Sequence, residues 1–139
     1  MIRPLEQVHA EMADEHRRIM DLVSRIESES NLSVLPAMLR ELHDLLVNHF
    51  AHEQFPGGLY ESMGAHGPDY HEDLKVLVRE HCTVLSTARA LVERARAVDL
   101  QGGAKLLGEV ADLLQMLRDH EVREHRLVEK LKAASAAAG

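Results

Sequence analysis

The sequence predicts an all-α protein, an antiparallel up-down four-helix bundle, on three observations. Apolar residues recur at alternating steps of four and three, the spacing that places them on one face of a helix. Alternation of apolar and polar residues with period two never persists, and β-branched residues are scattered, which argues against strands. Turn-forming residues divide the 139-residue chain into four long segments. Its apolar content of 45 % excludes a disordered chain, and its length is sufficient for one domain with a substantial core.

Proline, glycine and serine mark the ends of the four predicted helices. These helices cover residues 4–28, 33 or 36 to 55, 69–98 and about 103–132. Pro4 suits the first turn of the first helix, and Asp69 is a candidate N-cap of the third. A connection containing glycines, residues 56–68, separates the second helix from the third. We expect residues 1–132 to form the bundle and residues 133–139, which have no apolar anchor beyond alanine, to form a flexible C-terminal tail.

Histidine is unusually frequent, with ten among 139 residues, and several histidines interrupt the apolar stripes of the predicted helices. Every polar residue in these stripes is histidine or glutamate. An unpaired charge in a bundle core costs several kcal/mol, so buried histidines and glutamates at matching positions on four helices require a common partner. Six residues meet this description: His16, His49, Glu53, His81, His120 and Glu124.

The register of the two predicted hairpins brings the four histidines to one level. At about 1.5 Å per residue, His16 lies about 18 Å from the end of the first helix and His49 about 19 Å from the start of the second. His81 and His120 lie about 24 Å and about 25 Å from the facing ends of the second hairpin. Each glutamate follows a histidine by four residues and therefore lies one turn further along the same face.

Four imidazoles and two carboxylates around one point suit two metal ions bridged by the carboxylates. This mixed set of nitrogen and oxygen ligands favours iron or manganese over calcium, and it differs from the closed, often thiolate-rich shell of structural zinc. Six protein ligands for two metals leave open coordination positions. The sequence therefore predicts a reactive centre that admits a bridging oxygen species or a diatomic ligand.

The order of these residues resembles the hemerythrin-like, or HHE cation-binding, domain family. The strings "DEHRRIM", "NHFAHEQFP", "REHCTVL" and "RDHEVREH" are similar to the four motif helices of that family, and the likeness covers about residues 6–131. The resemblance implies a non-haem di-iron centre, oxo- or hydroxo-bridged, in a four-helix bundle. It also implies four iron-ligating histidines, His16, His49, His81 and His120, and two bridging carboxylates, Glu53 and Glu124.

The chain departs from the pattern of the oxygen-carrying hemerythrins. Those proteins have His-x-x-x-His on the third helix and His-x-x-x-x-Asp on the fourth. Here Leu77 and Leu85 flank His81 at that spacing, and His125 stands five residues after His120. The chain is closer to the branch with the pattern H, HxxxE, H, HxxxE. That branch includes iron-centre repair proteins, iron-sensing domains and bacterial hemerythrin-like proteins, with roles in responses to nitric oxide, peroxide or iron.

Three further residues are candidate additional metal ligands: Tyr60, His52 and His125. Tyr60 follows Glu53 by seven residues and returns to the stripe if the chain stays helical through the connection. His52 and His125 stand beside proposed ligands, and helical geometry aims them to the side. His9 lies about 10.5 Å along the axis from His16, too far for the same metal without a bend, and is expected to be a half-exposed histidine near the bundle end.

The net charge of −7 argues against nucleic acid as a partner, because phosphate binding needs concentrated positive charge. No apolar run approaches the ~20 residues of a membrane span, and the acidic start lacks a signal-peptide core, so a cytoplasmic location is expected. The expected partner is a small diatomic or peroxide ligand, with a protein partner or a homo-oligomer also open.

The predicted function is a di-iron protein that reacts with or senses O2, NO or peroxide, in oxidative or nitrosative stress. Two alternatives use the same centre: a peroxide-decomposing, catalase-like enzyme, and an iron storage or donor protein. Whether the chain is an enzyme stays open at this point.

Overall fold

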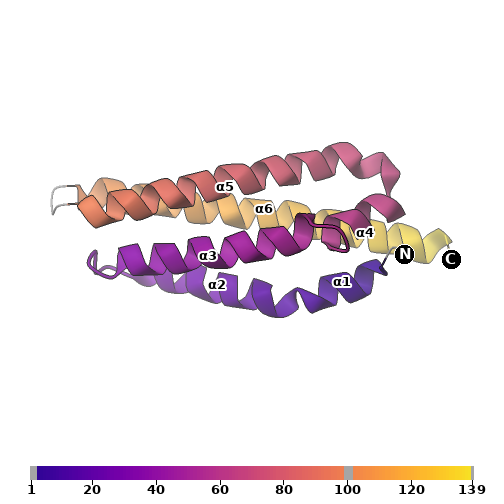
Figure 1. Ribbon diagram of the computed structural model, residues 1–139, viewed down its shortest axis with the longest axis horizontal. Helices are drawn as coiled ribbons and strands as arrows, with labels where there is room; N and C mark the ends of the chain where they lie inside the picture. Colours follow the sequence, from indigo (N-terminus) through magenta and orange to yellow (C-terminus); the bar gives the residue numbers. More distant parts are fainter. Residues whose placement is uncertain (1–2, 99–101, 139) are drawn as a thin grey trace.

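Four long helices lie side by side and alternate in direction, as the predicted up-down bundle requires (Figure 1). The computed structural model describes residues 3–98 and 102–138. The long helices are α2 (Ala13–Ser28), α3 (Leu35–Gln54), α5 (His71–Ala97) and α6 (Gly103–Ala138). At the end of the bundle where both termini lie are the short helices α1 (Leu5–Glu11) and α4 (Leu59–His66) and a 3-10 turn (Pro68–Tyr70). No strand occurs among the described residues, so the predicted all-α class is confirmed.

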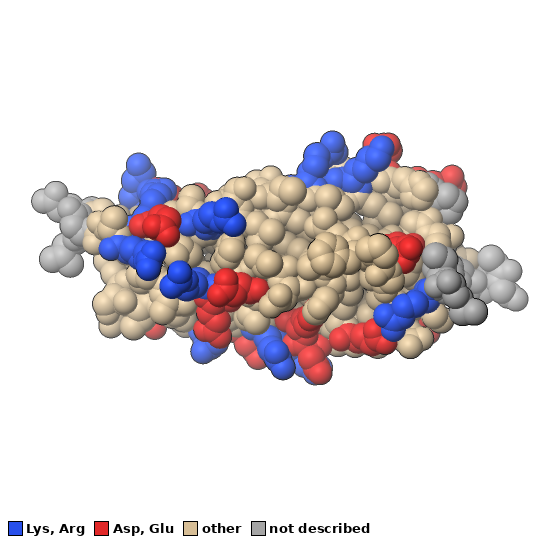
Figure 2. Space-filling view, in the orientation of Figure 1, with Lys and Arg blue, Asp and Glu red and all other residues tan. Residues whose placement is uncertain are grey.

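None of the described helices is both long enough and apolar enough to cross a bilayer. On the face shown in Figure 2, basic and acidic side chains lie mostly toward the two ends and the lower edge, and neither sign covers the face.

The apolar core is divided into two clusters that lie on either side of one level of the bundle. The larger cluster comes from all four long helices and includes Leu22, Leu39, Ala88 and Leu113. The smaller one unites α1, α4 and the facing turns of α5 and α6. The side chains buried between these clusters are polar, because the predicted histidines and glutamates occupy the stripe positions at that level.

The predicted helix of residues 4–28 is divided at Met12, so the prediction of one continuous helix is wrong. The Met12 N–H donates to the carbonyl of His9, three residues back, at 3.2 Å, which tightens the chain at this point. Helix α1 packs against α4, and Val8 and Met12 are buried with Leu59 in the smaller cluster. The burial of these side chains stabilises a change in the direction of the chain at Met12. The spacing of apolar residues does not predict that change.

The connection of residues 56–68 contains a sharp turn followed by α4, which the sequence did not predict. Gly57 has φ +82°, and a Cβ atom on Gly58 would collide with the carbonyl of His52. The chain therefore does not stay helical beyond α3; it turns and begins a new helix at Leu59.

Two predicted helix ends also differ. Asp69 lies in the 3-10 turn, and α5 begins at His71 with no side-chain cap on its first turn, so the predicted Asp69 cap is wrong. Helix α6 continues to Ala138 and not only to about residue 132. The flexibility of residues 133–139 stays a prediction.

Candidate metal centre

All six predicted site residues meet at one level of the bundle. Two groups of four residues could each hold a metal ion, because the ligand atoms within a group lie within 4.8 Å of one another. The first group is His16, His49, Glu121 and Glu124. The second group is Glu53, His81, His120 and Glu124.

Glu53 lies between the two pairs of histidines, and its two oxygens face opposite sides. Its Oε2 is 3.4 Å from His49 Nε2, one helical turn away on α3, and 3.9 Å from His16 Nε2 on α2. Its Oε1 is 3.1 Å from His81 Nε2 on α5. The i, i+4 spacing on α3 aligns the first contact, and the packing of α2 and α5 against α3 supplies the other two.

Glu124 repeats this arrangement from the opposite side of the centre. Its Oε2 lies 3.5 Å from His120 Nε2, four residues earlier on α6, and its Oε1 lies 3.7 Å from His16 Nε2. Each carboxylate thus offers one oxygen to each half of the centre.

Several buried polar atoms at this level lack a hydrogen-bond partner. Among the described residues, the buried side-chain atoms without one include His16 Nε2, His49 Nε2 and both oxygens of Glu53. Buried polar groups are normally satisfied, and leaving one unpaired costs about 1–3 kcal/mol. Four such atoms that converge on one point fit a bound cation, whose coordination bonds would replace the missing hydrogen bonds.

The pKa shifts of Glu53 and Glu124 also fit a cation between the two carboxylates. Burial raises the pKa of Glu53, but the imidazoles around it lower that pKa well below its ordinary value. Burial and then the charge of Glu53 hold the pKa of Glu124 well above its ordinary value. Two adjacent buried carboxylates cannot both ionise without a compensating cation. A dication between them would remove this conflict.

His49 is the histidine most affected by these charges. Burial alone would lower the pKa of His49, but its contacts with Glu53 and Glu15 raise that pKa to about 9. For His81 burial dominates, and the pKa falls below its ordinary value.

Tyr60 reaches the centre from α4, and its hydroxyl donates to Glu124 Oε2 at 2.6 Å. The same oxygen lies 2.9 Å from His81 Nε2. The Tyr60 ring stacks on His81 at a centroid distance of 5.4 Å, and Phe50 stacks on that imidazole at 3.7 Å. Burial and then the charges of Glu124 and Glu53 raise the pKa of Tyr60, so the phenol holds its proton here.

The comparison with protein families agrees with this geometry. The model of the family described as the hemerythrin HHE cation binding domain matches residues 6–131, nearly the whole chain. This protein belongs to the hemerythrin HHE family. None of the curated proteins and none of the solved structures compared with the chain matches it. Membership implies cation binding, and the buried groups of histidine and glutamate described above are suited to it.

The structure brings Tyr60, but neither His52 nor His125, to the centre of this hemerythrin-like bundle. The side chain of His52 is 58 % exposed, and its Nδ1 lies 2.5 Å from Glu15 Oε2. His125 is exposed and faces the half-buried ring of His9 at 6.4 Å. Neither group of candidate ligands contains these three histidines.

Glu121 belongs to the first group of candidate ligands but was not predicted from the sequence. Its Oε2 lies 3.3 Å from His16 Nδ1, and burial raises its pKa. Glu121 follows His120 directly and points about 100° round the helix from it, outside the apolar stripe. Its position directly after the proposed ligand His120 was the sequence feature that could have indicated it. In the structure this side of α6 faces α2.

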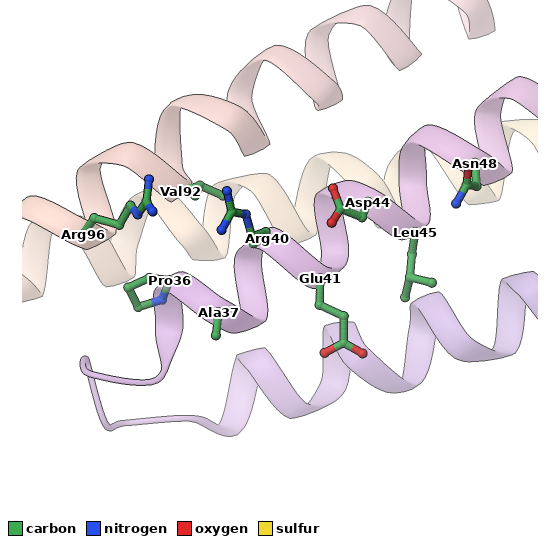
Figure 3. A pocket seen from close by; sticks show the side chains of 9 residues that line it. All are labelled: Pro36, Ala37, Arg40, Glu41, Asp44, Leu45, Asn48, Val92 and Arg96. Atoms are coloured by element: carbon green, nitrogen blue, oxygen red, sulfur yellow. The ribbon is translucent and has the colours of Figure 1, made fainter.

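A separate surface groove of about 560 Å³ between α3 and α5 is shown in Figure 3. The guanidinium groups of Arg40 and Arg96 lie on the same side of it, beside Val92. It contains no residue of either group, so it is not a route to the hemerythrin-like centre.

Proposed function

We propose that this hemerythrin-like protein binds two iron ions in a non-haem di-iron centre that reacts with or senses O2, NO or peroxide. The observation that supports this most strongly is the orientation of Glu53 and Glu124, each of which presents one oxygen to each pair of histidines. That is the arrangement required of carboxylates that bridge two metals. The nitrogen and oxygen donor set suits iron.

In this proposal each iron has its own histidines and shares the carboxylates. His16 and His49 would hold one iron, and His81 and His120 would hold the other. Bound iron supplies redox chemistry and open coordination positions for a small ligand. The protein contributes orientation, a low-dielectric surrounding and the exclusion of bulk water, since five of the six residues are buried.

Among the six proposed ligands, only His16 has a partly exposed side chain. Its side chain is 28 % exposed, whereas those of His81 and His120 are 1 % and 0 % exposed. His16 therefore marks the side of the centre that lies nearest to solvent. A cytoplasmic location and a role in stress responses stay predictions.

Tyr60 favours a second candidate function, the decomposition of peroxide. Its hydroxyl is a buried donor directly at Glu124 and lies within reach of a ligand at the centre. Such a group can hold or deliver a proton during turnover. An iron storage or donor role needs no such group, and it would show instead as rapid transfer of iron to an apo acceptor.

Anaerobic reconstitution with Fe2+, followed by metal analysis and a visible spectrum in air, tests the proposal. We expect two irons per chain and ligand-to-metal charge-transfer absorption. Less than one iron per chain would overturn the di-iron proposal. Peroxide assays on the loaded protein then separate a sensor, which need not turn over, from an enzyme.

A further inference from the structure

Each of the four central histidines turns its Nε2 toward the centre and its Nδ1 toward an acceptor on a neighbouring helix. Three acceptors are carboxylates and one is an amide. The Nδ1 contacts are His49 with Glu15 at 3.0 Å, His81 with Gln54 at 2.6 Å, His120 with Glu80 at 3.0 Å and His16 with Glu121 at 3.3 Å.

These four acceptors form a closed ring around the bundle. Each one stands next in sequence to a proposed ligand of its own helix, but it contacts the histidine of the next helix. The contacts run from α2 to α3, from α3 to α5, from α5 to α6 and from α6 back to α2. A residue beside a ligand points about 100° round its helix, which directs it to the adjacent helix and not into the centre.

The chemistry of imidazole explains what such acceptors do. A neutral histidine that binds a metal through Nε2 has its proton on Nδ1, and that N–H needs an acceptor when it is buried. A carboxylate at Nδ1 sets the tautomer, holds the ring in place and makes Nε2 a stronger donor. The same acceptor also prevents Nδ1 from competing for the metal.

Two of the acceptors are themselves held in place by a second contact. Glu15 uses its other oxygen to contact His52, and Glu80 uses its other oxygen to contact Arg123. Gln54 is the neutral member of the ring and contacts His81, whose imidazole stacks with Phe50 and with Tyr60. His81 is therefore oriented by an amide and by stacking, and the other three histidines by carboxylates.

We infer that Glu15, Gln54, Glu80 and Glu121 form a ring of positioning residues that links the four helices and sets the metal affinity of the centre. This inference rests on the proposed metal-binding function. The acceptors act through the histidine of the next helix. Glu121 also belongs to the first group of candidate ligands, and its contact with His16 Nδ1 assigns it to the ring rather than to the metal.

The first test compares Glu15→Ala, Glu80→Ala and Glu121→Ala, each of which removes the acceptor, with Glu109→Ala. Glu109 pairs with Arg94 on the surface of α6, so it controls for the loss of one negative charge. We expect the ring variants to bind Fe2+ and Co2+ about 10- to 100-fold more weakly in chelator competition, the usual cost of losing such a partner. The control should bind like the wild type. Ring variants that also bind like the wild type would overturn the inference.

A double-mutant cycle identifies the histidine through which Glu15 acts. In the background His49→Ala, the substitution Glu15→Ala should cost almost no further Co2+ affinity, because the imidazole it orients is gone. His16 is the neighbour of Glu15 in sequence. In the background His16→Ala, the substitution of Glu15 should lower the Co2+ affinity by the same factor as in the wild type. An equal cost in both backgrounds would contradict the ring and indicate a general structural or charge effect.

Two metal probes separate this inference from the function on which it rests. If the wild type binds Co2+ but not Fe2+, the iron proposal fails and the ring is still tested with Co2+. If the wild type binds both metals and the ring variants are unaffected, the ring alone fails. If the wild type binds neither metal, both fail.

Discussion

The two halves of the centre differ in how completely the protein arranges them in advance. In the second group, the His81 ring stacks with Phe50 and with Tyr60, and its Nε2 already contacts Tyr60, Glu53 and His120. In the first group, the Nε2 atoms of His16 and His49 have no hydrogen-bond partner among the described residues. Glu121 contacts His16 through Nδ1, the nitrogen that faces away from the centre, and the side chain of Glu121 is 16 % exposed.

This difference indicates two kinds of metal position in one bundle. The second position is sealed, since all four of its residues are buried, so a metal bound there should leave slowly. The first position is at the edge and should exchange with solvent more readily. Glu53 and Glu124 join the two, because each has an oxygen on both sides.

The largest effect is expected from Glu124→Ala, because Glu124 belongs to both groups. The variant should lose both metals under conditions in which the wild type retains them, as metal analysis after gel filtration would show. Glu129→Ala, on the exposed face of the same helix, is the control. Retention of both metals by Glu124→Ala would show that the two positions do not depend on a shared carboxylate.

A smaller effect is expected from removal of one histidine from either half. His16→Ala should lose one metal and keep a slowly released one, whereas His81→Ala should keep only a metal that a chelator removes rapidly. Metal content and release rate measure this difference, and circular dichroism of each variant checks that it is folded. Identical release rates would contradict the distinction between a sealed and an open position.

Metal affinity should rise with pH, because protons compete for the ligand atoms. Metal-free His49 has a raised pKa of about 9 and is therefore protonated at neutral pH, and metal must displace that proton. The apparent Co2+ affinity should increase about tenfold per pH unit for one displaced proton, from about pH 6 to about pH 8. A pH indicator should record proton release on binding. An affinity that is constant over this range would contradict the raised pKa.

The smallest effect on metal content is expected from Tyr60→Phe, which keeps the ring that stacks on His81 and removes only the hydroxyl. Both metals should stay bound, and the metal-free variant should lose about 1 kcal/mol of stability with the hydrogen bond to Glu124. Thermal unfolding and the visible spectrum measure these outcomes. Loss of a metal from the second position would instead make Tyr60 an essential ligand there.

Much of the fold and the level of the centre followed from periodicity. The stripes of apolar residues predicted the four long helices, and the burial of residues such as Leu39, Ala88 and Leu113 agrees with them. Hairpin geometry predicted that the histidines meet, because two helices joined by a short turn must face each other residue by residue.

Features that depend on which helix lies beside which were not predicted. Tyr60 was a candidate on the assumption of a continuous helix, yet it reaches the centre through a glycine turn and α4. The break at Met12 follows from the packing of α1 on α4, two segments far apart in sequence.

Local spacing along the chain was thus sufficient to select the helices, their buried faces and six residues at one level, since these depend on the period of a single helix. The assignment of partners was not contained in that spacing. Glu15 could face either neighbouring helix until the order of the helices around the bundle was known, and that order places it on His49. Contacts between helices depend on long-range packing, so the ring of acceptors and the inequality of the two metal positions emerged only from the assembled bundle.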